Sequence, residues 1–345
     1  MKTVDLRSDT VTLPPPEMRR AIAEAELGDD VFRGDPTVNR LEALAAKLMG
    51  KEAALLTTSG TQSNLTAMLS HCQRGDEVIV GDEAHILHFE AGGAFALGGL
   101  GLRTVRNDEQ GRLDLTEVRR AVRGRDVHFP PTGLICVENT HNRCGGSVLS
   151  AEDLAAVRAL ADEYGLPLHL DGARMFNASV AANVPVKEFA AHADTVQFCF
   201  SKGLAAPVGS MLVGTRSLIE RARKYRKMLG GGMRQAGILA AAALVALETM
   251  VDRLAEDHAN ARLLAEGLAE LPGIEIDLKR VQSNIVIFAV RSPRLDAPAF
   301  VRGLAARGVL AHQISPDSIR LVTHKDVNRE DILAALAAAR ALLAG

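Results

Sequence analysis

Short apolar runs alternate with helical patterns through the middle of the chain, and this alternation limits the fold more than any other feature. The runs lie at residues 53–56, 77–80, 102–105, 134–137, 166–170, 196–200 and 210–213. Strands that alternate with helices form mostly parallel sheets with helices packed on their faces. The sequence therefore predicts an α/β fold with a mostly parallel seven-stranded sheet.

The remaining sequence predicts a second, smaller unit. Residues 235–255 are rich in alanine and leucine and predict a long helix, and residues 259–271 carry another helical pattern. Because 345 residues exceed the usual size of one core, we expect two domains. They are an N-terminal arm with a large catalytic domain over residues 1–250, and a small C-terminal α+β domain over residues 251–345. In the small domain we expect strands at 284–290 and 318–321 and helices at 297–307 and 329–343.

Lys202 lies between two predicted strands, where a charged side chain is costly. A desolvated lysine can become a neutral amine that attacks carbonyl groups. Asp171 ends another predicted strand, and the carboxyl ends of parallel strands meet at one edge of the sheet. Pyridoxal phosphate needs such a pair, a lysine for a Schiff base and a carboxylate for its pyridinium nitrogen. A buried Lys–Asp ion pair in an ordinary α/β protein explains the two residues equally well.

Residues 57–64 follow a predicted strand and open a helix, and they contain Gly60 and Thr61. Glycine allows close approach to the backbone, and the free amides of a first helical turn attract phosphate. A simple helix cap is the alternative. Together with Lys202 and Asp171, the phosphate interpretation is favoured. The motif is neither the Walker pattern nor the dinucleotide pattern.

Four more cationic or ionisable side chains are candidates for the same site. His85 follows the strand at 77–80 and could stack on a pyridine ring, and His128 lies near another strand end. Arg234 follows three glycines and could reach a phosphate, including one across a subunit boundary. Arg320 lies among apolar residues, and its guanidinium fork suits a carboxylate. The alternatives are exposed or capping histidines, a plain helix entry and an edge-strand arginine.

The composition favours small-molecule ligands. A formal net charge of −2 leaves no basic excess, so nucleic acid is not an expected partner. The first residues lack the apolar core of a signal peptide, and no stretch offers about 18 uninterrupted apolar residues for a membrane span. The four cysteines and the scattered histidines lack the spacing of metal ligands. We expect a cytoplasmic protein with reduced thiols, no membrane contact and no bound metal.

Taken together, these motifs resemble those of the L-threonine aldolases, pyridoxal-phosphate enzymes of the aspartate-aminotransferase-like fold (fold type I). The resemblance runs nearly end to end. The segments that carry it are DLRSDTVT (5–12), GDDV (28–31), DPTVN (35–39), GTQSN (60–64), ENTHN (138–142), DGAR (171–174), SKGL (201–204), PVGS (207–210) and GGGMRQ (230–235). Several distinctive motifs in the same order make it specific.

The resemblance implies a role for each candidate residue. Lys202 would bind pyridoxal 5′-phosphate covalently, Asp171 would keep the pyridine nitrogen protonated and His85 would stack on the ring. The phosphate would bind Gly60, Thr61 and the neighbouring subunit's arginine that corresponds to Arg234. Ser8, Arg174 and Arg320 would bind the substrate carboxylate, with Arg174 also close to the cofactor's phenolic oxygen, and His85 and His128 would lie near the β-hydroxyl.

The resemblance also implies the reaction and the assembly. The expected activity is retro-aldol cleavage of L-threonine, L-allo-threonine or other β-hydroxy-α-amino acids, through an external aldimine and a quinonoid. The expected assembly is a homotetramer with active sites at the dimer interface. Another fold-type I lyase, a β-eliminating one, is the nearest alternative; a non-catalytic amino-acid-binding protein and a metal-dependent aldolase are more distant ones. Phe32 stands where a tyrosine is common, and Cys144 is a candidate for oxidation.

Overall fold

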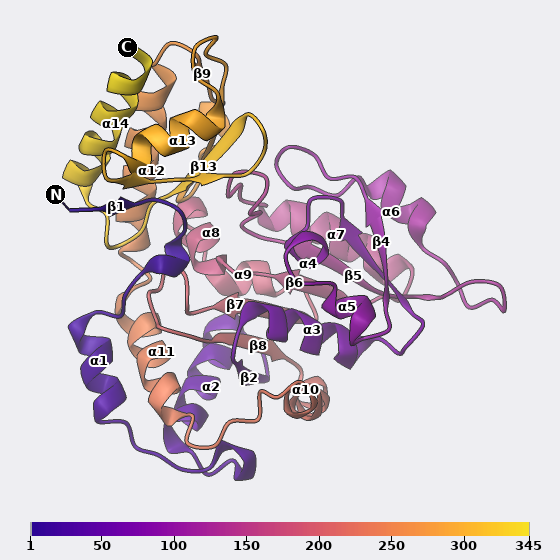
Figure 1. Cartoon of the computed structure of the whole chain (residues 1–345). Helices are drawn as coiled ribbons and strands as arrows, with labels where there is room; N and C mark the ends of the chain where they lie inside the picture. The colour runs from indigo at the N-terminus through magenta and orange to yellow at the C-terminus, as the bar shows by residue number, and fades with distance from the viewer. Residues whose placement is uncertain (1, 345) are drawn as a thin grey trace.

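The computed structural model describes residues 2–344 and contains the predicted sheet (Figure 1). Its seven strands lie in the order β2-β8-β7-β6-β5-β3-β4. Only β8 runs opposite to the other six strands, so the prediction of a mostly parallel sheet is confirmed. The strands are β2 Ala53–Thr57, β3 Glu77–Gly81, β4 Gly101–Val105, β5 Thr132–Glu138, β6 Leu168–Asp171, β7 Thr195–Cys199 and β8 Ser210–Gly214.

Alternate residues of each strand face opposite sides of the sheet, and helices cover both sides. Ile79 and Ile135 point into a large core with α2, α6, α7 and α11. Val78 and Leu134, one residue earlier in each strand, point into a separate core with α3 and α5. The helices are α1 Pro16–Ala23, α2 Pro36–Met49, α3 Gly60–His71, α4 His85–His88, α5 Gly93–Ala96, α6 Leu115–Ala121, α7 Ala151–Glu163, α8 Met175–Ala182, α9 Val186–Ala190, α10 Arg216–Met228 and α11 Gly237–Thr249.

The local sequence determines where several of these helices begin and end. At α2, Asp35 Oδ1 accepts hydrogen bonds from the backbone nitrogens of Thr37 (3.1 Å) and Val38 (3.0 Å), and Pro36 occupies the first turn. The same helix ends at Gly50, whose φ of 63° is left-handed. These caps satisfy backbone groups that would otherwise be unpaired at the helix ends.

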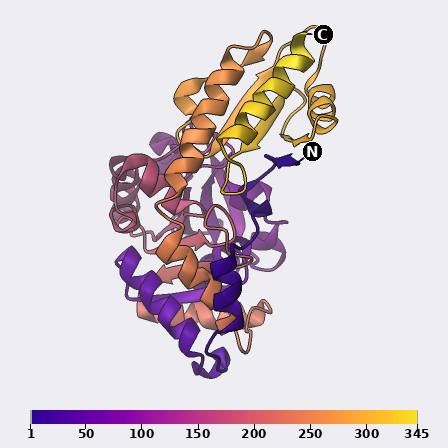
Figure 2. The same ribbon diagram turned by 90° about the vertical axis from the view of Figure 1, so that its left-hand side faces the viewer.

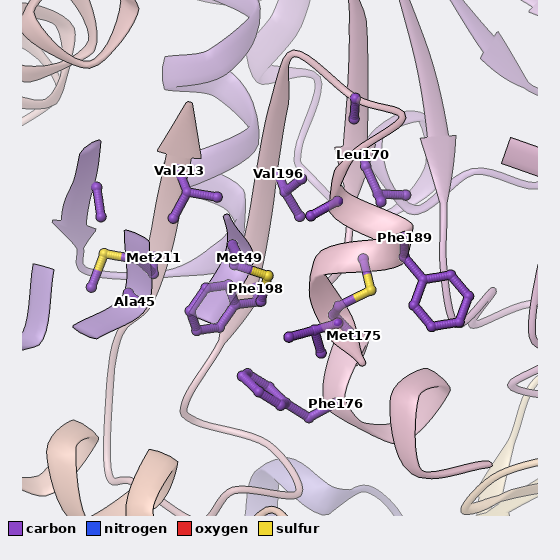
Figure 3. Close-up of a cluster of buried hydrophobic side chains, with 14 of the residues drawn as sticks. Ala45, Met49, Leu170, Met175, Phe176, Phe189, Val196, Phe198, Met211 and Val213 are labelled. Carbon is purple, nitrogen blue, oxygen red and sulfur yellow. The ribbon is translucent and has the colours of Figure 1, made fainter. Parts of the chain in front are cut away.

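Aromatic and sulfur-containing side chains fill the large core between β7 and the helices that cover it (Figure 3). Phe198 is fully buried and its ring meets Phe176 edge-on at a centroid distance of 5.4 Å. It also meets Phe200 edge-on at 5.2 Å. Met49 and Met175 lie beside these rings in the same cluster. Packing of this kind fixes β7, and with it the segment that leads to Lys202.

The C-terminal α+β unit is also confirmed. Its antiparallel sheet has the order β12-β13-β10-β9. Its long helices pack against the sheet and one another around a separate apolar core. The elements are α12 Leu254–Ala269, β9 Ile274–Glu275, β10 Ile285–Val290, α13 Ala297–Ala305, β11 Val309–Leu310, β12 His312–Gln313, β13 Ser318–Val322 and α14 Arg329–Ala344.

The first residues of the chain, which belong to the expected N-terminal arm, pack on this C-terminal unit. Strand β1 (Val4–Asp5) pairs in parallel with β11, and the N-terminus lies near the small unit (Figure 2). Val4 and Leu6 are buried in the core of the small unit, and this apolar contact holds the N-terminal segment there. The domain boundary near residue 250 stays a prediction.

The helix predicted over residues 235–255 is interrupted, and this prediction was wrong in detail. Helix α11 ends at Thr249 and α12 begins at Leu254. Met250 and Leu254 are buried in the large core, whereas Leu264 of α12 is buried in the small one. Helix α12 therefore begins in the large core and continues into the small one. Within residues 2–344, no helix has both the length and the apolar character that crossing a membrane requires.

Replacing Phe198 with alanine should lower the free energy of unfolding by about 3–5 kcal/mol, because the lost ring leaves a cavity among buried neighbours. Chemical or thermal unfolding measures the change. Leu333→Ala, at a side chain that is 49% exposed, is the control and should shift stability by less than about 0.5 kcal/mol. A loss below about 1 kcal/mol at Phe198 would contradict the packing in Figure 3.

Candidate active site

Five of the predicted site residues line one cavity of about 600 Å³ between the large sheet and the C-terminal unit. They are Ser8, His85, Arg174, Lys202 and Arg320. Three of them follow strands of the large sheet: His85 follows β3, Arg174 follows β6 and Lys202 follows β7. The parallel strands end at the same edge, so residues that are far apart in sequence converge there.

Asp171, the last residue of β6, is buried beside this cavity and accepts three hydrogen bonds. Its Oδ2 accepts from Asn64 Nδ2 at 2.9 Å. Its Oδ1 accepts from the backbone nitrogen of Ala173 at 3.1 Å and from the side-chain amide of Gln197. Hydrogen bonds of this kind favour the ionised form of a carboxyl group.

The charge of Asp171 is maintained by its neighbours. Burial alone would raise the pKa of Asp171. The charges of His85 and Lys202 and the hydrogen bond from Gln197 outweigh burial and lower this pKa below its ordinary value. The carboxylate is therefore ionised at neutral pH and can hold a cationic ring nitrogen.

His85 is anchored by two carboxylates. Its backbone nitrogen donates to Glu138 Oε2 at 2.7 Å, and its ring Nδ1 lies 3.0 Å from Glu90 Oε1. Burial alone would lower the pKa of His85, but the hydrogen bond with Glu90 and the charge of Asp171 raise it. The imidazole is thus a stronger base than an isolated histidine.

Arg174 is already paired with a carboxylate, whereas Arg320 is not. Arg174 donates to both carboxylate oxygens of buried Asp9 at 2.7 Å each. Its Nη1 also donates to Asn142 Oδ1 at 3.4 Å, and Arg320 Nη1 donates to the same oxygen at 3.1 Å. Arg320 meets no carboxylate in these contacts, and its buried Nε has no hydrogen-bond partner. Burial lowers the pKa of Arg320 to about 10, and the charge of Arg174 adds to this effect.

A bound carboxylate would therefore stabilise the charged guanidinium of Arg320 more than that of Arg174. An anion would neutralise a partly desolvated guanidinium and provide an acceptor for its unpaired nitrogen. The guanidinium of Arg174 is already paired with the carboxylate of Asp9. A contact between Arg174 and the substrate carboxylate stays a prediction.

The phosphate turn begins α3 as predicted, although Gly60 and Thr61 do not line the cavity with Lys202. Ser59 caps the helix by accepting from the backbone nitrogen of Gln62 at 3.2 Å. A side chain at position 60 would come within 2.9 Å of Cys199 Sγ, so only glycine lets α3 approach β7 this closely. Thr61 follows in the first turn, where backbone amides are free to bind an anion.

The glycine-rich loop before α11 lies against the phosphate turn. Gln62 Nε2 donates to the backbone oxygen of Leu229 at 3.5 Å, and a side chain at Gly231 would collide with the Gln62 amide. Arg234 follows this loop, is 56% exposed and pairs with Asp29 at 3.2 Å. Its guanidinium therefore lies on the outside of this chain.

The fold does not bring His128 to the cavity. His128 lies in the loop before β5, at the edge of the sheet opposite the carboxyl ends. Its side chain is 78% exposed and its Nδ1 lies 2.8 Å from Asp126 Oδ1. A residue at the amino end of a parallel strand cannot reach the carboxyl edge of the same sheet. His85 and His128, which were both expected near the substrate's β-hydroxyl, therefore do not meet within one chain.

Comparison with known proteins shows the family to which the chain belongs. The β-eliminating lyase family model matches residues 5–291. The low specificity L-threonine aldolase of Escherichia coli (strain K12) is 48% identical over 341 residues, covering 99% of both chains. Low-specificity L-threonine aldolase 1 of Arabidopsis thaliana is 47% identical, covering 96% of this chain and 94% of the relative. The chain belongs to the low-specificity L-threonine aldolases.

A solved threonine aldolase from Leishmania major shares the fold of this family member. The two structures superpose with a TM-score of 0.85 at 20% identity, covering 99% of each chain. At that identity the likeness concerns the fold alone. It supports the fold-type I architecture that the motifs predicted.

The site residues of this threonine aldolase family member fit pyridoxal phosphate, the cofactor that the family and fold imply. Asp171 offers an ionised, buried carboxylate for the ring nitrogen, and Lys202 lines the cavity beside it. His85, Glu90 and Asp171 also place possible metal-ligand atoms within 4.8 Å of one another. These groups already hydrogen-bond to each other or to Asn64, so we interpret them as a hydrogen-bonded network.

Several residues of the site were missed at the sequence level. Asp9, Asn64 and Asn142 lie inside motifs that carried the resemblance, but nothing local shows which side chains they contact. Glu90 lies in none of those motifs. The two residues that depart from the family pattern, Phe32 and Cys144, differ in their surroundings. Phe32 is exposed. Cys144 is buried, and burial raises the pKa of its thiol to about 12.

Asp9→Asn should destabilise the protein by about 3–5 kcal/mol, because it leaves the buried charge of Arg174 unpaired. Arg174 overcomes the effect of burial and holds the pKa of Asp9 below its ordinary value. The ion pair therefore stabilises the fold above the unfolded pKa, near 4, and the benefit fades as the pH falls further.

Unfolding curves measured from neutral pH to about pH 3 test this prediction. The gap between wild type and Asp9→Asn should narrow on the acid side. Asp5→Asn removes an exposed pair with Arg7 in the same segment and should cost at most about 1 kcal/mol. Equal, pH-independent losses in both variants would contradict the assignment.

Proposed function

We propose that this protein cleaves L-threonine, L-allo-threonine and related β-hydroxy-α-amino acids to glycine and an aldehyde. The observation that carries the proposal is the meeting of Lys202 and a carboxylate-free Arg320 at one cavity, with the ionised carboxylate of Asp171 buried beside it. Near full-length identity to proteins named low specificity L-threonine aldolase supports the choice of reaction.

Each residue has a task that follows from its chemistry. Lys202 would hold the cofactor through a covalent bond to its aldehyde carbon, and the amide nitrogens of Gly60 and Thr61 would hold its phosphate. Asp171 would keep a proton on the ring nitrogen. When bound, pyridoxal phosphate accepts the electron pair of the breaking Cα–Cβ bond.

Binding and proton transfer fall to other side chains. Arg320 would bind the substrate carboxylate, together with Ser8 and Arg174, which line the same cavity. This fixed carboxylate would orient the Cα–Cβ bond for cleavage. An imidazole would take the β-hydroxyl proton. Two imidazoles of this chain line the cavity, His85 and His312, and His85 is the one that lies near Asp171 and Lys202.

Incubation with L-threonine tests the reaction directly. We expect acetaldehyde and glycine in equal amounts, and ammonia with 2-oxobutanoate would instead establish β-elimination. Lys202→Ala should remove the yellow, borohydride-sensitive colour and reduce turnover by at least about 10³-fold, because the covalent anchor is lost. Lys51 contacts Ala193 far from the cavity, so a Lys51→Ala variant should keep the yellow colour and the turnover.

We further propose a homotetramer in which other copies complete each site. Two exposed functional side chains support this proposal, Arg234 beside the phosphate turn and His128 on the far edge of the sheet. Val127 and Phe129, next to His128, are also exposed apolar residues, as expected for a loop that inserts into another subunit. His128 of one chain would then face His85 of another.

Subunit complementation tests this arrangement. His128→Asn should reduce kcat/KM by about tenfold or more if the imidazole contacts substrate. Hybrid assemblies from co-expressed Lys202→Ala and His128→Asn chains should regain activity, because a chain with Lys202 can receive His128 from its neighbour. Activity no higher than the average of the two separate variants would show that His128 acts within its own chain or not at all.

Cellular location is the remaining proposal. We propose that the protein is cytoplasmic, as its four cysteines support. All four are free and buried, as expected for a protein kept under reducing conditions.

A further inference from the structure

Glu90 is a buried carboxylate with no role in the proposed reaction. It lies between α4 and α5, and its side chain is 3% exposed. Its Oε1 meets the ring Nδ1 of His85 at 3.0 Å and accepts from Asn64 Nδ2 at 2.7 Å. A carboxylate is seldom buried this deeply without a specific partner.

The hydrogen bonds around Asn64 determine which groups of this network donate and which accept. Ionised carboxylates only accept hydrogen bonds, so the amide nitrogen of Asn64 must face Glu90 and Asp171. Its oxygen then faces His169 Nε2 at 3.0 Å, which must donate. Burial raises the pKa of Glu90, and the hydrogen bonds with His85 and Asn64 oppose this rise. When Glu90 is ionised, His85 must donate to it from Nδ1.

The position of His85 leaves it little freedom to adopt another arrangement. Glu138 holds its backbone nitrogen, and the same carboxylate accepts from the backbone nitrogen of Asn142 at 2.8 Å. The ring of Phe89 lies 5.5 Å from the imidazole ring, tilted by 45°. With Nδ1 held by Glu90, the lone pair of Nε2 points away from Glu90.

We propose that Glu90 is the positioning residue of His85, holding a proton on Nδ1 so that Nε2 serves the cavity as a proton acceptor. Through Asn64, the same carboxylate couples the orientation of this imidazole to Asp171. The proposal rests on the proposed aldol cleavage for its kinetic consequences, although the protonation of His85 can be measured independently.

The charge of Glu90 sets the pH dependence expected of this arrangement. The ionisable groups that face His85 are Glu90, Asp171 and Glu138, which favour its protonated form, and Lys202, which opposes it. Removing the negative charge of Glu90 lowers the pKa of His85. A base must be unprotonated to act, so the acid limb of kcat/KM should then move to lower pH.

Glu90→Gln in the full-length holoenzyme is the first test. It should lower kcat by about 10- to 100-fold, part of what a positioned base contributes, with KM changed by less than about threefold. The acid limb should shift by about one unit toward lower pH. Glu42→Gln is the matched control, because Glu42 is another buried carboxylate far from the cavity and should leave the limb in place.

A double-mutant cycle separates positioning from a general structural effect. If Glu90 acts through His85, Glu90→Gln should cost little further activity in a His85→Asn background. If Glu90 only supports the fold, the two losses should multiply. Multiplying losses, or an acid limb that stays in place, would overturn the proposal.

Nitrogen-15 NMR of wild-type protein labelled at histidine tests the protonation state without any variant of Glu90. The His85→Asn variant identifies the His85 signals. A protonated Nδ1 and an unprotonated Nε2 at high pH are expected, and the reverse tautomer would refute the proposal. If the wild type lacked aldol cleavage, the proposed function would fail, while this measurement would still decide the role of Glu90.

Discussion

A buried negative charge at the end of β6 sets the conditions for the rest of the site. Asp171 is costly to bury, and it stays ionised because Asn64, Gln197 and the backbone of Ala173 donate to it while His85 and Lys202 lie nearby. These donors come from α3, β7 and the turn after β6, so the packing of those elements on one another is a requirement for the charge. A cofactor that needs a protonated ring nitrogen can use such a carboxylate.

The cavity depends equally on the contact between the two units. Asp9 comes from the N-terminal segment, Arg174 from the large sheet, and Arg320 from β13 of the small unit. The Asp9–Arg174 pair and the shared acceptor Asn142 link all three. Because β1 pairs with β11, a movement of the small unit would also move the segment that holds Ser8 and Asp9. The lining of the cavity and the position of the small unit are therefore physically coupled.

Structure follows from the sequence most directly where a local pattern has a local cause, and prediction succeeds there. Apolar runs that alternate with helices predict a parallel sheet, and the strand ends then converge on one edge, which is why Lys202, Asp171 and His85 could be grouped in advance. It fails where distant parts of the chain decide the outcome. The helix predicted over residues 235–255 is broken between Thr249 and Leu254, although the intervening sequence contains neither glycine nor proline. His128 was grouped with His85 although the two lie at opposite edges of the sheet.

By itself, the sequence determined the fold class, the family and the residue types for the proposed chemistry, because periodicity, caps and ordered motifs are properties of neighbouring residues. Only the tertiary structure decided which side chains meet. It engaged Arg174 with Asp9, left Arg320 without a carboxylate, and placed Glu90 against His85. Hydrogen bonds and charges act across a few ångströms of space, and the residues that they join, such as Asn64 and Asp171, are separated by many positions in the chain.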